Sequence, residues 1–203
     1  MFKNINKVVR IMIMADLIMY SGWGLINPIL AVFIVNSIKG GDLRVAGTAI
    51  GIYWLVKSIV QIPLAHYLDK NHGEKDDYYA LLIGTFVISV VPLGFIFASL
   101  PSHMYFLQII NALGMAMVAP SWAGIFTRHI EIKREAFCWG AESSAVSLGS
   151  GIGGIIGGIV ASVLGFIPLF IMVSVIGLIS TSLLLTIKQS ILPKERIYPM
   201  PKP

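Results

Sequence analysis

The sequence predicts an all-α membrane protein with six transmembrane helices. Hydrophobic residues make up 56% of the 203 residues, charged residues make up only 12%, and the mean hydropathy is +0.82. A soluble chain usually carries about 25% charged residues. The apolar residues gather into six long stretches, each near the roughly 20 residues that a helix needs to cross a bilayer. These observations exclude an ordinary soluble domain.

The six predicted spans follow one another closely along the chain. They cover residues 11–38, 45–68, 78–100, 104–127, 137–164 and 167–187. Several links are only a few residues long, and short links force neighbouring helices to pack antiparallel. We therefore expect one membrane domain over residues 1–190. Residues 191–203 contain four prolines and four charged residues, a composition that favours a flexible tail.

The basic residues predict the orientation of the spans. Twelve Lys and Arg residues fall on one side of the predicted membrane, and only Lys39 and Arg44 fall on the other. Because cytoplasmic loops carry the excess of Lys and Arg, we expect both termini in the cytoplasm and the chain in a plasma or inner membrane. The net charge of +5 is spread over short links and forms no single patch, so nucleic acid is not an expected partner.

Three ionisable residues interrupt the apolar spans. Lys57 lies near the middle of the second span, Asp16 lies within the first, and Glu142 lies within the fifth. An ionisable side chain at the centre of a membrane helix costs about 2.5–3.5 kcal/mol on insertion scales, and it generally faces protein or water. We interpret Lys57 as a ligand contact and the two carboxylates as candidate proton-coupling groups. The alternative for the carboxylates is a solvated position near the headgroups.

Polar and aromatic residues share helix faces with these charged groups. Residues three or four apart lie on one face of a helix. The first span carries such a stripe at Asp16, Tyr20, Trp23 and Asn27; the second at Trp54, Lys57 and Gln61; and the fourth at Gln108, Asn111, Met115 and Trp122. The stripes predict the lining of a water-accessible cavity that binds substrate. The alternative is a set of hydrogen-bonded helix contacts in a closed bundle.

Motifs for enzymes, metals and cofactors are not evident. The four histidines lie at membrane edges or in loops without metal-ligand spacing. The chain has no Gly-x-Ser-x-Gly elbow and no His-Glu-x-x-His helix. We therefore expect no catalytic residues, no metal and no cofactor. The single cysteine, Cys138, allows no disulfide within the chain.

A dense run of glycines occupies the middle of the fifth span. Small residues four apart let two helix backbones approach closely. The run comprises Gly149, Gly153, Gly154, Gly157 and Gly158. A second motif follows the second span, where the chain carries Asp69, Lys70, Gly73 and Lys75.

These two motifs resemble the major facilitator superfamily, especially its proton-coupled drug antiporters. The family's fifth helix reads Gly-x-x-x-Gly-Pro-x-x-Gly-Gly, and its first cytoplasmic loop reads Gly-x-Leu-x-Asp-Arg/Lys-x-Gly-Arg-Lys. The resemblance covers all six spans as one half of the family's twelve. It implies that two six-helix halves rock around a site at the membrane midplane. It also implies that the loop residues act as a gate, with Asp69 latching onto the other half.

The resemblance and the polar stripes together predict a secondary transporter for a small organic solute, working by alternating access. A lone six-helix half would expose its cavity to lipid, whereas two copies on a two-fold axis would cover it. We therefore expect a homodimer with one shared cavity. The alternatives are a non-transporting membrane scaffold, a subunit that pairs with a different half-transporter, or a piece of a twelve-helix protein.

Overall fold

The computed structural model describes residues 5–70 and 74–191, and the regular structure within these ranges is entirely helical. The helices are α1 (Lys7–Ile26), α2 (Leu30–Ser37), α3 (Leu43–Lys70), α4 (Glu74–Ile96), α5 (Pro101–His129), α6 (Glu135–Leu164), α7 (Phe166–Leu185) and α8 (Lys188–Ile191). With α1–α2 and α7–α8 each taken as one span, the described part of the chain holds six helices long and apolar enough to cross a membrane. The predicted fold class is confirmed. Most of the predicted tail, 192–203, lies outside the described residues.

The first predicted span is two helices in the structure. Helix α1 ends at Ile26, and α2 begins at Leu30. Pro28 lies in the turn between them, and it has no N–H to donate to a carbonyl four residues earlier. The backbone N–H of Ile29 instead donates to the carbonyl of Ile26 over 3.0 Å, which tightens the turn. The break therefore places Asn27 at a bend rather than inside a helix.

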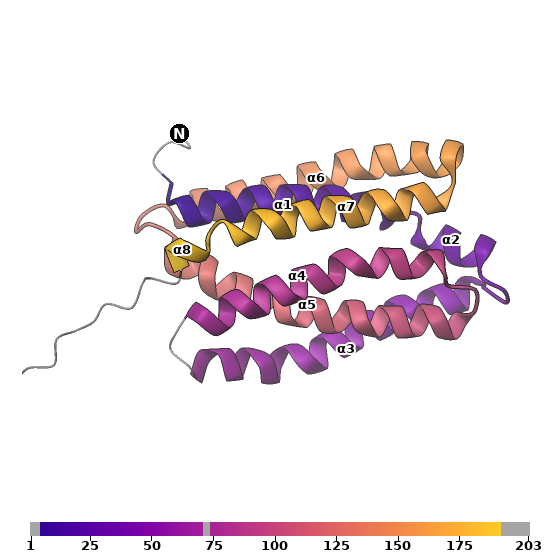
Figure 1. Ribbon diagram of the computed structural model, residues 1–203, viewed down its shortest axis with the longest axis horizontal. Coiled ribbons are helices and arrows are strands. Elements are labelled where there is room, and N and C mark those ends of the chain that lie inside the picture. Colours follow the sequence, from indigo (N-terminus) through magenta and orange to yellow (C-terminus); the bar gives the residue numbers. More distant parts are fainter. Residues whose placement is uncertain (1–4, 71–73, 192–203) are drawn as a thin grey trace, which may run out of the picture.

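The helices pack so that α3 and α6 lie at opposite edges of the bundle. Helix α1 packs against α6 and α7, α4 packs against α7 and α5, and α3 packs against α5 (Figure 1). Only 11% of the apolar window of α3 and 17% of that of α6 is buried, against 39–50% for the other four spans. These two edge helices therefore leave most of their surface without a partner in the chain.

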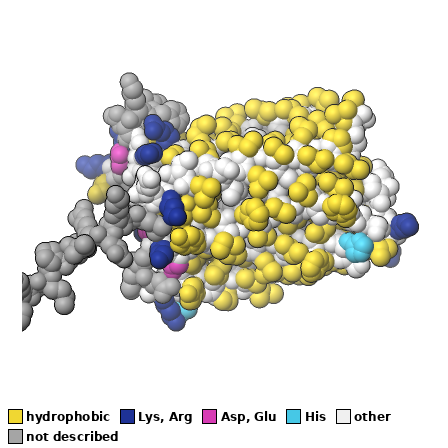
Figure 2. Space-filling model, in the orientation of Figure 1, with side chains coloured by type: hydrophobic (Ala, Val, Ile, Leu, Met, Phe, Trp, Pro, Cys, Tyr) yellow, Lys and Arg dark blue, Asp and Glu magenta, His cyan; other side chains and the backbone are white. Residues whose placement is uncertain are grey.

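On the face drawn in Figure 2 the charged side chains gather at the ends of the bundle, and most of the described Lys and Arg residues lie at one end. We call this the basic end; it is where α1 begins, α3 ends and α6 begins. Here the Nε of Arg128 on α5 donates to Oε1 of Glu74 over 2.9 Å, and its Nη2 donates to the carboxylate of Asp77. The Asp77 side chain is only 5% exposed. Arg128 therefore ties the start of α4 to the end of α5.

Candidate functional site

A cavity of about 670 Å³ lies inside the bundle, lined by side chains from α1 through α7. Pockets of roughly 300–1,000 Å³ hold small organic molecules. The cavity lies between the two edge helices, with Lys57 of α3 on one wall and Glu142 of α6 on another. The structure thus places two of the three ionisable residues singled out in the spans on opposite sides of one space, and the third, Asp16, lines the same space.

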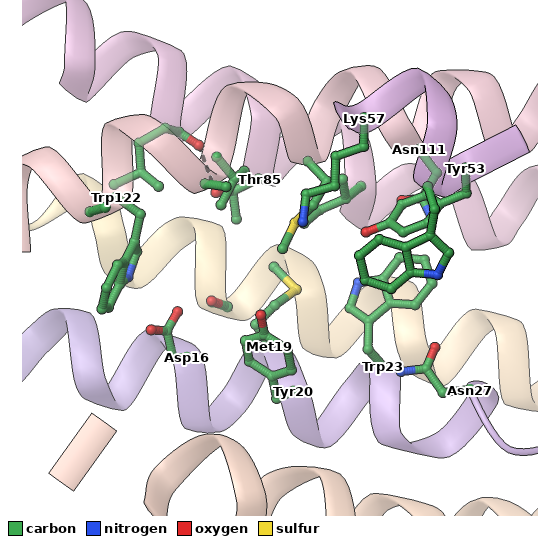
Figure 3. Close-up of a pocket in the computed structure, with 18 of the residues that line it drawn as sticks. Asp16, Met19, Tyr20, Trp23, Asn27, Tyr53, Lys57, Thr85, Asn111 and Trp122 are labelled. Atoms are coloured by element: carbon green, nitrogen blue, oxygen red, sulfur yellow. Dashed lines mark hydrogen bonds between the residues drawn. The ribbon is translucent and has the colours of Figure 1, made fainter. Parts of the chain in front are cut away.

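The polar stripe of α1 forms one wall of the cavity. Asp16, Tyr20 and Trp23 of α1 and Asn27, just beyond its end, all line it, and their side chains follow one another in that order in Figure 3. The helix presents them together because their spacing of four, three and four residues matches the helical repeat. An adjacent face of α1 packs against α6, where Gly149, Gly153 and Gly157 approach the backbone of Leu17, Ser21 and Leu25. The sequence pattern thus predicts which face of α1 lines the cavity, and the glycines of α6 account for the close packing beside it.

Helix α3 contributes an aromatic and cationic patch. The Nζ of Lys57 lies 5.1 Å from the centroid of the Trp54 ring, a cation–π distance. Tyr53 also lines the cavity, and its ring meets that of Trp54 edge to face at 5.1 Å. Gln61, which we predicted on the same face, is half-buried and does not belong to the cavity lining.

Helix α5 supplies buried amides to the wall. Gln108 is 3% exposed and Asn111 is 7% exposed, and both line the cavity. The Nδ2 of Asn111 lies 3.5 Å from Oε1 of Gln108, a long hydrogen bond. Each amide group therefore keeps polar atoms that can serve a bound solute, because a primary amide offers two donors and an acceptor.

Two carboxylates and two indoles gather toward the basic end of the cavity. Asp16 and Glu142 both line the cavity, each within ten residues of the start of its helix at the basic end. The Trp122 ring stacks on that of Phe126 at 4.4 Å and lies 5.9 Å from that of Trp139. In Figure 3 the indole of Trp122 lies beside the carboxylate of Asp16. Within the described residues, the buried Nε1 of Trp122 makes no hydrogen bond of ordinary geometry, but it is near enough to act as a weak donor to that carboxylate. This end therefore sets an indole donor beside a carboxylate acceptor.

The acidic and basic side chains of the cavity lie at different levels along the bundle axis. In Figure 3 the ammonium group of Lys57 lies farther from the basic end than Asp16, between the levels of Asp16 and Trp23. Aromatic rings of Tyr20, Trp23 and Tyr53 surround that region. A solute in this space would meet carboxylates toward the basic end, and aromatic rings together with the Lys57 ammonium group farther from it.

The sequence patterns missed part of the lining. Trp139 lines the cavity three residues before Glu142, and a search of that helix face at a spacing of three would have found it. Thr85 also lines the cavity, but its hydroxyl donates to the carbonyl of Leu81 over 2.6 Å. No sequence signal distinguishes this threonine from others in apolar helices.

The predicted gate lies away from the cavity, at the basic end. Asp69 and Lys70 are exposed at the end of α3, and Lys75 is exposed in the first turn of α4. Gly73 lies outside the described residues. Among the described residues, no group of three or more His, Cys, Asp or Glu side chains could hold a metal ion.

The predicted packing glycines divide into two sets. Gly149, Gly153 and Gly157 lie against α1; a Cβ at Gly153 would be 2.4 Å from the carbonyl oxygen of Ser21. Gly154 has only loose neighbours near 4 Å, and Gly158 has none within 4 Å. The close approach of α1 and α6 thus depends on a glycine at every fourth residue of α6, from Gly149 to Gly157.

Comparison with known proteins agrees with this architecture. A search of curated proteins found no match. The family model of the Major Facilitator Superfamily matches residues 12–199, which is most of the chain and covers five of the six spans in full and most of the first. The chain therefore belongs to the major facilitator superfamily, a family of membrane transporters.

Proposed function

We propose that this chain is a secondary active transporter that carries a small organic solute by alternating access. The observation that supports this most directly is the cavity of about 670 Å³ between membrane-spanning helices, with Asp16, Lys57 and Glu142 on its walls. Ionisable groups inside membrane spans are costly and generally serve transport or proton transfer. A closed scaffold would have no need for such a cavity.

The walls favour an amphipathic solute with an acidic group. Lys57 offers a cation for that group, and the rings of Trp23 and Trp54 offer flat surfaces for an apolar body. Asp16 and Glu142 lie toward the basic end, where they would exchange protons with the cytoplasm if that end faces inward, as the excess of Lys and Arg favours. In this proposal the two carboxylates couple solute movement to protons.

We further propose that the transporter is a homodimer of six-helix halves. Transporters of this family rock two such halves around a site at the membrane midplane. Few residues of α3 and α6 are buried within the chain, so both helices have surface available to pack against a second half. In each copy, Asp69 would lie at the interface between the halves and act in the gate, close to the positive end of a partner helix.

Transport by the purified protein in proteoliposomes tests the proposal. A panel of labelled amphipathic organic anions would be offered with and without a pH gradient. We expect Lys57→Ala to reduce uptake at least about tenfold, equal to losing an interaction of about 1.4 kcal/mol. Asp16→Asn and Glu142→Gln should remove the response to the pH gradient. Lys39→Ala, a change at the exposed opposite end, is the matched control. Unchanged uptake in all three cavity variants would contradict the assigned roles.

A further inference from the structure

The cavity carries charges of both signs, and we propose that its solute is a zwitterion whose ammonium group binds beside Asp16 and Glu142 while its acidic group meets Lys57. This inference rests on the proposed transport function and names the class of solute. It adds a positively charged group, at a defined distance, to the acidic group already inferred.

The charged groups of the cavity are not paired with one another. Among the described residues, every ion pair lies at the basic end and joins α5 or the start of α6 to acids of α4 or of the α5–α6 link. Asp16, Lys57 and Glu142 take part in none of these pairs. Ionisable groups inside membrane spans generally pair with one another or mark the path of a substrate. Two carboxylates and one ammonium group are therefore available to a bound molecule.

The protein neutralises these carboxylates only in part. Beside Asp16 lies the indole N–H of Trp122, a neutral and weak donor. A carboxylate has about four lone-pair sites, so most of the accepting capacity of Asp16 stays open. Glu142 lines the same space from α6. Within the described residues, these two are the only acids that line the cavity.

Aromatic rings flank the two carboxylates. The rings of Trp122 on α5 and Trp139 on α6 lie 5.9 Å apart, and both residues line the cavity. Tyr20 lines it one turn after Asp16. Carboxylates and aromatic faces together attract an organic ammonium group, whereas Ca²⁺ or Mg²⁺ would need about six oxygen ligands. This part of the cavity therefore suits an organic cation.

The other part of the cavity offers donors instead of acids. Lys57 is the only Lys or Arg among the described lining residues, and its Nζ lies 5.1 Å from the Trp54 ring centroid. Farther from the basic end, the Gln108 side chain is nearly buried, and its one hydrogen bond in the described chain is made through Oε1 to Asn111. The two N–H donors of Gln108 thus remain free for an acceptor. An acidic group fits here and would be repelled at the other end.

The helices set the distance between the two subsites. Counted from the basic end at about 1.5 Å per residue, Glu142 lies about 11 Å along α6, Asp16 about 14 Å along α1 and Lys57 about 20 Å along α3. The opposite charges are therefore about 6–9 Å apart along the bundle. Figure 3 shows the same order, with the Lys57 ammonium group farther from the basic end than Asp16. An α-amino acid carries both charges on one carbon and does not span this distance.

The wall between the two subsites is apolar. Met19 of α1 and Met115 and Val118 of α5 line the cavity there. Methionine side chains adapt to the shape of a neighbouring group, so a ring or a short apolar chain can join the two charged ends of the solute. The cavity volume of about 670 Å³ holds a molecule of this size.

The number of charges agrees with the proposed coupling to protons. The solute's acidic group would neutralise Lys57, and its ammonium group would neutralise one of the two carboxylates. The second carboxylate then remains for the proton. A singly charged solute would leave either Lys57 or both carboxylates without a partner inside the membrane, which is costly.

Two isomeric probes test the charge spacing with the full chain in detergent. Phenylalanine and para-(β-aminoethyl)benzoate contain the same atoms, but the second carries its charged groups on opposite sides of the ring. We expect it to bind at least about tenfold more tightly than phenylalanine in calorimetric titration. Its N-acetyl derivative and its amide each lack one charge and should each bind about tenfold more weakly than the parent. Equal binding of all the probes, tighter binding of a singly charged one, or no binding by any of them would overturn the proposal.

Cavity variants test which end of the solute binds where. Asp16→Asn with Glu142→Gln should remove the preference for the parent probe over its N-acetyl derivative and keep the preference over its amide. Lys57→Gln should do the reverse, a reciprocal change that a loss of folding does not produce. Glu131→Gln removes an exposed acid outside the cavity and should keep both preferences. Loss of both preferences in either cavity variant, or of neither, would refute the assigned orientation.

Uptake in proteoliposomes separates this inference from the proposed function. A zwitterion that binds with the expected preferences but is not carried would refute only transport. Uptake of singly charged solutes together with no binding of the zwitterion would refute only the dipolar solute.

Discussion

The contact between α1 and α6 makes a sharp prediction for Gly157→Ala. The added methyl would lie 2.1 Å from the carbonyl oxygen of Leu25 and 2.6 Å from its Cα. Ordinary contacts begin near 3.4 Å, so the backbones must separate by more than 1 Å. Both obstacles belong to the backbone of a helix, which cannot rotate away as a side chain can. We expect a loss of about 1–3 kcal/mol in the free energy of unfolding, as for other overpacked cores.

The neighbouring residue provides the control. A methyl at Gly158 meets nothing within 4 Å, and alanine in a helix is favoured over glycine by roughly 0.5–1 kcal/mol. Gly158→Ala should therefore leave stability unchanged or raise it. Denaturant unfolding in detergent, followed by circular dichroism at concentrations too low for dimers, compares the two variants. Equal stability of both variants would refute the view that α1 and α6 meet backbone to backbone.

Three further variants probe other contacts. Arg128→Ala leaves the nearly buried carboxylate of Asp77 unpaired and should cost about 1 kcal/mol of unfolding free energy, whereas Arg44→Ala should cost little. Ser180→Ala removes a buried 2.7 Å hydrogen bond to the carbonyl of Ala15 and should cost about 0.6 kcal/mol by the same assay; Ser182→Ala, exposed and bonded within its own helix, is the comparison. Trp122→Phe removes the indole N–H beside Asp16 but keeps an aromatic ring, so the free energy of unfolding should change by no more than about 1 kcal/mol while the thermal shift given by a transported solute falls; an unchanged shift would remove the indole N–H from the site.

The spans could be predicted because crossing a membrane imposes a length and a composition that local sequence carries. The bend in the first span was missed although Pro28 is visible in the sequence. A hydropathy window stays apolar across residues 27–29, and a proline in a membrane helix does not always break it. Pro63, Pro92 and Pro120 all lie inside continuous helices. Which proline breaks a helix depends on the packing around it.

The candidate site could be predicted in part because a helical repeat places charged and aromatic residues on one face. The repeat does not say how far along the helix that face borders open space. Lys57 and Gln61 share a face of α3, yet only Lys57 lines the cavity. The limits of the cavity are set by neighbouring helices, which periodicity within one helix does not describe.

The glycines of α6 show most clearly what sequence periodicity leaves open. Read along the chain, residues 149–158 look like a single packing motif. In three dimensions the glycines face two directions, because residues four apart share a helix face while adjacent residues lie about 100° apart around the helix. Gly157 lies under the backbone of α1, and Gly158 faces away with no neighbour in its own chain. Hydropathy does not separate these positions, because a glycine has the same hydropathy whether it packs against protein or has no neighbour. Side-chain size does not separate them either, because the exposed positions of α6 include large side chains such as Ile152 and Ile159 as well as Gly158. Only the arrangement of the neighbouring helices decides which glycine is covered.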